Sequence, residues 1–485
     1  MSTFKNNLKI LITVTIIIKI LGFIYKILQA RIFPFEVLAT ISAINPIMSF
    51  SLVLSQVSIP ILLTSLLSKR INQKTYYNRA LISKAIRFNL ISTTIIILIM
   101  LIVVYLLDKT IYSSIDIITP LMILFPSLYF SNMSAIIKSY LEVHDEFRRT
   151  ITSNLLEAII KISGLLFILS LFYKLSSKQV IILSTLFVTI GEISSFLFLL
   201  KKVKKLTILN LVNEKEPTKM LKPGLTLTTF SLVFATTHML EPMLYYHFTN
   251  HIGIPKIDSN YIYTSIHSYC LPLFQISGFM TYIIIKLMTP KISKSTDLKN
   301  DVSTLNRIYV ILLSIEGLIL FLFFNCSNFI LKIAYNKENI SYMIKILAFQ
   351  TYLTFFSPIL TMSFESKLKY KNLLKNAIIA CIVDLILIIL LSLIKKIALY
   401  AIFISGFISD LTYYYLNLAD FKHNCNRLPF KLKDIIFILF TVSITILQAL
   451  LNKKISFIFL LIVYFIVSLF FLKRNKEPSS FSDNE

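Results

Sequence analysis

Hydrophobic residues follow one another along this chain in repeated blocks separated by short polar segments. Each block reaches about 20 residues, which is long enough for an α-helix to cross the ~30 Å hydrocarbon core of a bilayer. The pattern predicts an all-α polytopic membrane protein with about fourteen transmembrane helices. The expected spans are residues 9–31, 38–67, 86–107, 117–140, 150–173, 179–200, 223–249, 262–289, 304–324, 342–364, 373–394, 398–420, 433–451 and 456–472.

The composition strengthens this prediction. Of the 485 residues, 56% are hydrophobic and only 15% are charged, and the mean hydropathy is +0.76. A soluble domain carries about 25% charged residues. The four cysteines are widely spaced, so they predict neither a metal site nor a disulfide framework.

The net charge of +25 is unevenly distributed along the chain. Lysine and arginine gather in alternate loops, and the loops between them, such as 108–116 and 251–261, are nearly neutral. Because basic loops stay on the cytoplasmic side, this asymmetry predicts both termini in the cytoplasm. We expect the basic loops to contact anionic membrane lipids rather than nucleic acid. These loops include residues 68–84, 201–206, 367–375 and the tail segment 473–476.

The longest polar connection, 201–222, separates the first six expected helices from the next eight. We therefore expect an N-lobe at 1–205, a cytoplasmic linker at 206–222 and a C-lobe at 223–422. Two extra helices at 423–472 and a cytoplasmic tail at 473–485 complete the division.

A weak internal repeat connects the two halves. Aligning Pro46 with Pro272 places Ser42 on Ser268 within similar serine-rich, proline-containing stretches. Proline removes a backbone hydrogen bond and bends a helix. Broken helices at corresponding places in two halves point to the central site of a transporter.

Two lysines lie within the first expected helix, in the stretch IIIKILGFIYKILQARIF at 16–33. Seven helical residues turn through roughly 700°, so Lys19 and Lys26 lie within about 20° of one another on one face. A charged lysine in hydrocarbon costs at least about 2.5–3.5 kcal/mol. The stripe therefore predicts a wet, protein-lined cavity, and the alternative is that both side chains extend to the cytoplasmic surface.

Acidic residues are also expected within the helices. Glu157 and Lys161 have the i,i+4 spacing of a structural ion pair. Glu241 follows His238 by three residues, and Asp384 lies within a later helix. The simplest role for these acids is to neutralise nearby lysines. No nucleotide-binding loop, nucleophile elbow, zinc motif or paired catalytic carboxylates occurs, so we expect neither an enzyme nor a metal site.

The stretch KILGFIYKILQAR at 19–31 resembles the first-helix motif of the stage V sporulation protein B branch of the polysaccharide flippases. This branch belongs to the multidrug/oligosaccharidyl-lipid/polysaccharide (MOP) exporter superfamily, which also contains the lipid II flippases. Segments 57–69, 134–162 and 271–294 are similar to later family segments. The chain departs from the family in having only 8 glycines. The matching positions of the first motif are Lys19, Gly22, Phe23, Tyr25, Lys26, Ala30 and Arg31.

The resemblance implies two six-helix lobes around a central cavity, with two additional C-terminal helices. It implies a flippase in the plasma membrane that moves a polyprenyl-pyrophosphate-linked saccharide, such as a cell-wall precursor, by alternating access. Sporulation and cell-wall synthesis enzymes are the implied context. Cationic residues would hold the pyrophosphate, and Glu241 with Asp384 would bind a coupling sodium ion or proton, with no other cofactor. The implied substrate-binding residues are Lys19, Lys26, Lys138 and Lys286.

Two other functions stay open. A cation-coupled multidrug exporter of the same superfamily would favour acidic rather than basic residues in the N-lobe cavity. A membrane scaffold for cell-wall enzymes would depend on its cytoplasmic loops instead of the lysine stripe.

Overall fold

The computed structural model describes most of the chain, and the described residues are mainly helical and include no strand. The described ranges are 2–69, 75–112, 115–144, 146–171, 174–202, 218–292, 302–337, 339–366, 369–425, 427–451 and 453–474. Most of the expected linker and nearly all of the expected C-terminal tail lie outside these ranges.

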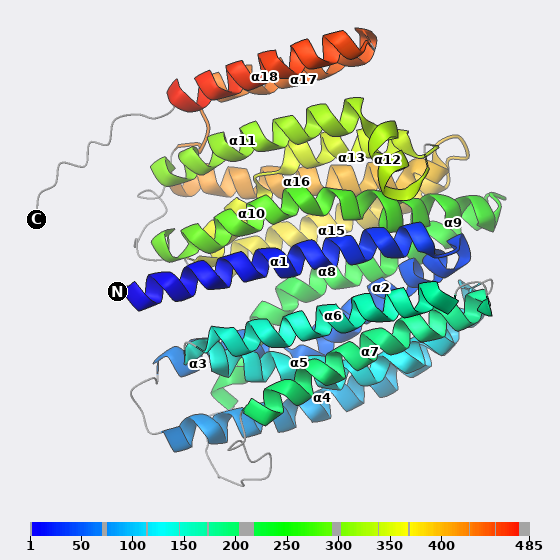
Figure 1. Cartoon of the computed structure of the whole chain (residues 1–485), viewed down its shortest axis with the longest axis vertical. Helices are drawn as coiled ribbons and strands as arrows, with labels where there is room; N and C mark the ends of the chain where they lie inside the picture. The colour runs from blue at the N-terminus through cyan, green and yellow to red at the C-terminus, as the bar shows by residue number, and fades with distance from the viewer. Residues whose placement is uncertain are drawn as a thin grey trace, which may run out of the picture. The chain divides into compact units, whose positions relative to one another are not determined.

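The chain divides into two compact units. The first comprises Met1–Ser268 with Leu385–Ile402. In it α7 packs against α5 and α6, α1 packs on α6, and α2 contacts α4, α5, α7 and α8 (Figure 1). Its helices are α1 (Ser2–Ile32), α2 (Phe35–Gln56), α3 (Ile59–Lys69), α4 (Thr75–Thr110), α5 (Ile118–Val143), α6 (Phe147–Leu171), α7 (Ser177–Lys202), α8 (Thr218–His251) and α9 (Lys256–Thr264).

The second unit comprises Tyr269–Asp384 and Phe403–Glu485. In it α11 contacts α10, α12, α13, α17 and α18. The π-helical segment η2 (Ser265–Cys270) joins the two units in the chain. The helices that follow it are α10 (Leu271–Ile292), α11 (Val302–Asn325), α12 (Ser327–Tyr335), α13 (Ser341–Thr354), α14 (Ser357–Ser366), α15 (Tyr370–Ser392), α16 (Ala401–Cys425), α17 (Leu432–Leu451) and α18 (Lys454–Arg474).

These units place 223–268 with the first part of the chain, whereas the expected C-lobe begins at 223. The lobe boundaries drawn from the sequence stay a prediction.

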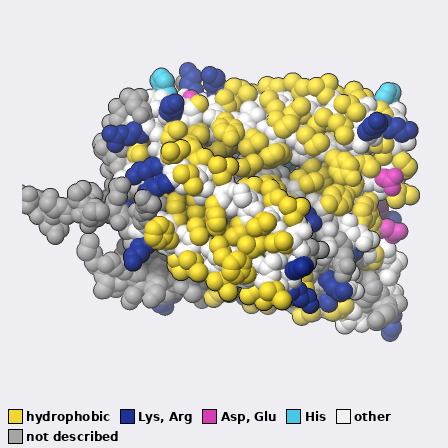
Figure 2. All heavy atoms as spheres, turned by 90° about the horizontal axis from the view of Figure 1, so that it is seen from above, with side chains coloured by type: hydrophobic (Ala, Val, Ile, Leu, Met, Phe, Trp, Pro, Cys, Tyr) yellow, Lys and Arg dark blue, Asp and Glu magenta, His cyan; other side chains and the backbone are white. Residues whose placement is uncertain are grey.

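The helices confirm the expected polytopic membrane protein. Among the described residues, 10 helices are long and apolar enough to cross a membrane, and a bent pair formed by Lys256–Gln275 and Ser277–Ile285 would make 11. Each expected span coincides with one helix or with consecutive helices, while the full number of crossings stays a prediction. Large apolar side chains such as Leu98 and Phe459 are 59% and 63% exposed. Hydrophobic side chains cover the middle of the face in Figure 2, with lysine and arginine mostly toward its two ends.

A sharp break separates α2 from α3. Val57 and Ser58 have φ values of 46° and 47°, a left-handed conformation that is rare for a β-branched residue. The carbonyl of Ser55, beside the break, accepts hydrogen bonds from Asn89 Nδ2 and Ser92 Oγ of α4, each at 3.1 Å. Partners of this kind are what permit irregular backbone at membrane depth.

This break is not at the expected proline, because α2 continues through Pro46. In the other half, the π-helical segment η2 ends at Cys270, two residues before Pro272 of α10. The repeat-related serines meet: Ser42 Oγ lies 2.9 Å from Ser268 Oγ. Equivalent residues contact one another where they approach a two-fold axis, so this contact favours the internal repeat.

Small residues let α6 and α7 approach closely. A Cβ added at Gly164 would overlap the ring of Phe187, and one at Gly191 would lie 3.3 Å from the carbonyl oxygen of Glu157. Close helix contacts in membranes depend on such residues. Although the chain has few glycines, these two lie where α6 and α7 approach one another closely.

Candidate functional site

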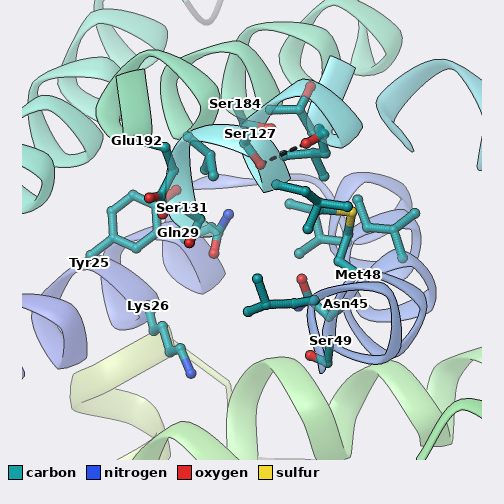
Figure 3. Close-up of a pocket in the computed structure, with 17 residues that line it drawn as sticks. Tyr25, Lys26, Gln29, Asn45, Met48, Ser49, Ser127, Ser131, Ser184 and Glu192 are labelled. Carbon is teal, nitrogen blue, oxygen red and sulfur yellow. Dashed lines mark hydrogen bonds between the residues drawn. The ribbon is translucent and has the colours of Figure 1, made fainter. Parts of the chain in front are cut away.

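A cavity of about 470 Å³ with both apolar and polar lining residues lies in the first unit between α1, α2, α5 and α7. Its charged lining residues are Lys26 of α1 and Glu192 of α7. Figure 3 shows Tyr25 and Glu192 on one side of the cavity and Asn45 and Ser49 of α2 across from them. The remaining polar lining is made of amides and hydroxyls, including Gln29, Ser127, Ser131, Ser184 and Thr185.

Lys26 is the lysine of the stripe that reaches this cavity. Lys19 interacts electrostatically with Lys26 but does not line the cavity. Gly22, between the two, has no atom within 4 Å of an added Cβ, so this face of α1 is open. Both lysines are exposed on this face, as expected for one stripe, and their roles as substrate ligands stay predictions.

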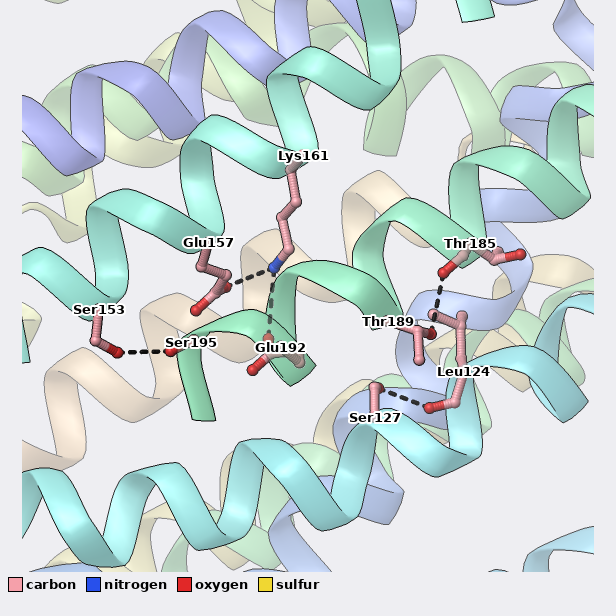
Figure 4. A network of polar contacts seen from close by, with 9 residues as sticks. All are labelled: Leu124, Ser127, Ser153, Glu157, Lys161, Thr185, Thr189, Glu192 and Ser195. Carbon is pink, nitrogen blue, oxygen red and sulfur yellow. Dashed lines mark hydrogen bonds and ion pairs between the residues drawn. The ribbon is translucent and has the colours of Figure 1, made fainter. Parts of the chain in front are cut away.

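Lys161 forms a three-residue ion network beside the cavity. Its Nζ lies 2.6 Å from Glu157 Oε1 and 3.4 Å from Glu192 Oε1 (Figure 4). The side chains of Lys161 and Glu157 are each 21% exposed and that of Glu192 is 16% exposed. The first contact is the i,i+4 pair expected from the sequence, and Glu192 extends it to α7.

Glu192 was not identified from the sequence. Its partner Lys161 is 31 residues away, so no helical spacing connects them. The available signal was an isolated acid next to Gly191 in an otherwise apolar helix. The glycine matters because it allows the α6 backbone to come close to α7.

Lys138 of α5 belongs with this network rather than with the cavity lining. It interacts electrostatically with Glu157, Glu192 and Lys161, and it does not line the cavity. Lys138 also interacts with Glu142, so two lysines lie near three glutamates and each lysine has acidic neighbours. A role for Lys138 in substrate binding stays a prediction.

The acids of the network thus interact with Lys138 and Lys161, whereas Lys26 is a cation of the cavity lining that no acid neutralises among the described residues. Within the described part of the chain it forms no ion pair, and its electrostatic neighbour is another lysine, Lys19. Glu192, the acid in the same lining, is instead paired with Lys161. The cavity therefore offers a positive charge together with neutral amides and hydroxyls and with apolar side chains such as Ile44 and Leu128, an arrangement that can accept an anion.

A second cavity, of about 450 Å³, lies in the second unit between α10, α13, α14 and α16. Its charged lining residue among the described side chains is Asp410, whose Oδ2 accepts a 2.7 Å hydrogen bond from Gln350 Nε2. Lys286 is part of α10, but its side chain lies outside the described residues.

The expected cation-coupling residues fall in different units. Glu241 of α8 belongs to the first unit, and its Oε2 lies 3.1 Å from His238 Nδ1. Asp384 of α15 belongs to the second unit and is buried. Their joint role stays a prediction. Among the described residues, no group of three or more histidine, cysteine or acidic side chains is arranged to hold a metal ion.

Comparison by sequence finds no matching family model and no matching curated protein. Comparison by structure finds clear likenesses. The lipid II flippase MurJ, in an inward closed conformation, has a TM-score of 0.64 and 17% identity, over 95% of this chain and 97% of that one.

Two further solved structures are similar. An inward-facing multidrug resistance MATE family transporter of the MOP superfamily has a TM-score of 0.63 and 13% identity, over 84% of this chain and 94% of that one. A MOP superfamily transporter from Pyrococcus furiosus, described as having a binding pocket of reverse polarity, has a TM-score of 0.60 and 13% identity, over 88% of this chain and 96% of that one. The chain thus has the fold of MOP superfamily transporters, and none of these neighbours is named as an enzyme.

Proposed function

We propose that this protein moves a polyprenyl-pyrophosphate-linked saccharide across the plasma membrane by alternating access, with both termini in the cytoplasm. The observation that carries the proposal is Lys26, a cation without an acidic partner among the described residues, in the lining of a cavity of about 470 Å³ that also carries amides and hydroxyls. The likeness to a lipid II flippase supports a lipid-linked substrate.

The cavity chemistry suits both parts of such a headgroup. Lysine binds phosphate as a point charge, so Lys26 would hold the pyrophosphate. Amide and hydroxyl groups both donate and accept hydrogen bonds, so Gln29, Asn45 and Ser49 would contact the saccharide. The polyprenyl tail would stay in lipid, beside apolar helix surfaces such as that of α18.

The finer assignments rest on the sequence. The first-helix motif at 19–31 supports the stage V sporulation protein B branch, and with it a cell-wall precursor for the spore cortex. Lys19, Lys138 and Lys286 would extend the cationic path of the headgroup. Anionic lipids and cell-wall synthesis enzymes would be the membrane partners.

A multidrug exporter is the second candidate. Asp410 places a carboxylate in the lining of the second cavity, and an acid-lined cavity favours cationic substrates. The likeness to MATE family transporters agrees with this alternative. The two candidates differ in the charge of the substrate and in the residue that would recognise it.

Native mass spectrometry of the purified protein with undecaprenyl-pyrophosphate saccharides tests the proposal. A hydrogen bond to a charged group contributes about 1.5–3 kcal/mol, and 1.4 kcal/mol is a tenfold change in affinity. We therefore expect Lys26→Ala to weaken saturable binding by roughly 10- to 100-fold. Lys395→Ala, in the exposed turn after α15, removes the same charge away from the cavity and serves as the matched control.

Equal loss of binding in the two variants would indicate peripheral lipid attracted by net charge, and would refute a headgroup site at Lys26. An organic cation that binds selectively, and that Asp410→Asn releases, would favour the exporter instead.

A further inference from the structure

Glu316, in the middle of α11, is a buried acid outside the proposed headgroup cavity. The residue is 1% exposed. Its Oε1 accepts a 2.6 Å hydrogen bond from Ser277 Oγ of α10, and its Oε2 has no hydrogen-bond partner among the described residues. An isolated carboxylate is strongly disfavoured in such surroundings, and a buried acid responds by taking up a proton.

Among the described side chains, the helices that pack on α11 supply no positive charge to Glu316. α10 contributes Ser277, and α18 contributes the hydroxyl of Tyr464, which interacts with Glu316 electrostatically and donates a hydrogen bond to the Ser314 carbonyl at 2.6 Å. α13 contributes Tyr352, which interacts with Tyr464.

Two further charged groups on these helices have other neighbours. Asp434, at the start of α17, interacts with Lys431 and Lys433. Lys345 of α13 lies 5.5 Å from the ring centroid of Phe324. Over the described residues, no lysine, arginine or histidine interacts with Glu316.

Ser277 connects Glu316 to the cavity of the second unit. It lines that cavity of about 450 Å³ together with Thr281, Thr351 and Thr354, and it also donates the hydrogen bond to the Glu316 carboxyl. A serine hydroxyl has one donor and two acceptor positions. It can therefore give a proton to one group while it receives a proton from another.

We propose that Glu316 is a proton-binding site of the second unit, loaded and emptied through the Ser277 hydroxyl from this cavity. In loading, the hydroxyl proton of Ser277 passes to Oε1 of the carboxylate, and the Ser277 oxygen takes a proton from hydronium in the cavity. The net result is one proton moved from cavity water to the carboxyl, and unloading reverses each transfer. One carboxyl and one hydroxyl offer far fewer oxygen ligands than hard metal cations such as Ca²⁺ take, so a proton fits the site better.

Such a site would contribute to transport only if its proton affinity differs between two conformations of the protein. A ligand shifts an equilibrium by as much as its affinity differs between two states. A proton on Glu316 stabilises the conformation in which the carboxyl is buried, and proton release favours a conformation in which water reaches it. This inference goes beyond the saccharide proposal and does not depend on which substrate is carried.

Infrared difference spectroscopy of the full chain in lipid nanodiscs tests the proposal without any saccharide. Spectra in mildly acidic and mildly alkaline buffer would be subtracted, and the carbonyl band of a protonated carboxylic acid would be followed. We expect a band that Glu316→Gln abolishes, because an amide of the same size and shape cannot titrate. Glu36→Gln, at an exposed position, is the matched control and should leave the Glu316 band intact.

The variant Ser277→Ala distinguishes a proton path through the Ser277 hydroxyl from a Glu316 that is buried without such a path. It should keep the band, shift its frequency through loss of the hydrogen bond, and slow its response to a pH jump. A titrating band that persists in Glu316→Gln would assign the proton to another acid and overturn the proposal. No difference band in the wild type, or a band that Ser277→Ala leaves unchanged in frequency and rate, would also overturn it.

Discussion

The replacement Lys161→Met tests whether the ion network between α6 and α7 stabilises the first unit. Methionine has a similar length but no charge, so the variant would leave the carboxylates of Glu157 and Glu192 facing one another without their shared cation. Lys138, on α5, would remain as an electrostatic neighbour of both acids.

The burial of the three side chains sets the size of the effect. Breaking a buried ion pair by removing one partner costs about 3–5 kcal/mol, because the remaining charge stays buried. The side chains are 16–21% exposed, so we expect about 3 kcal/mol, the lower end of that range. Replacing all three residues by neutral ones of similar size should recover most of this loss, because no unpaired charge then remains.

Unfolding in mixed detergent micelles, followed by circular dichroism, measures the difference in free energy. The matched control is Lys178→Met, because Lys178 pairs with Asp116 at 3.4 Å but the two side chains are 68% and 43% exposed. An exposed pair contributes about 0.2–1 kcal/mol. If Lys161→Met destabilises the protein no more than Lys178→Met does, the network does not hold the helices together and the reasoning is wrong.

Two further predictions follow from local geometry. Gly164→Ala should destabilise the protein by about 1–3 kcal/mol through overpacking against Phe187, whereas Gly406→Ala, with no atom within 4 Å of the added Cβ, should leave thermal unfolding nearly unchanged. Burial alone would raise the pKa of Asp116, but hydrogen bonds from the amide and hydroxyl of Thr119, together with the charge of Lys178, outweigh it and lower that pKa. A lowered pKa contributes stability above the ordinary aspartate range, and this contribution is lost as pH falls through the folded-state pKa. Asp116→Asn should therefore flatten the acid side of a stability–pH curve, and an unchanged curve would contradict the prediction.

Much of the helical framework could be predicted from the spacing of apolar blocks alone, because each block must satisfy its own backbone in lipid. The positions of the breaks between helices could not be predicted from these blocks. The α2–α3 break lies at Val57 and Ser58, just before Pro60 in the first turn of α3, while Pro46 lies inside a continuous helix. Proline alone therefore does not tell a break from an uninterrupted helix. The Ser42–Ser268 contact agrees with the alignment of the two halves, and the repeat itself stays a prediction.

The candidate site was predictable only in part. Helical periodicity placed Lys19 and Lys26 on one face. The packing of α1 against its neighbours then brings Lys26, and not Lys19, to the cavity lining. The pairing of Lys161 with Glu192 depends on how closely α6 approaches α7 at Gly191. A sequence without an alignment does not reveal that approach, because it is a property of two helices and not of one.

The most direct test of the central claim is movement of the headgroup itself. Proteoliposomes would carry a fluorescent undecaprenyl-pyrophosphate saccharide, and a membrane-impermeant quencher would report the fraction on the outer leaflet over time. The account predicts that the wild-type protein and Lys395→Ala both accelerate exchange between leaflets, and that Lys26→Ala, which removes the charge lining the cavity, does so much less. Exchange no faster than in protein-free liposomes, or exchange equally fast in Lys26→Ala, would contradict it.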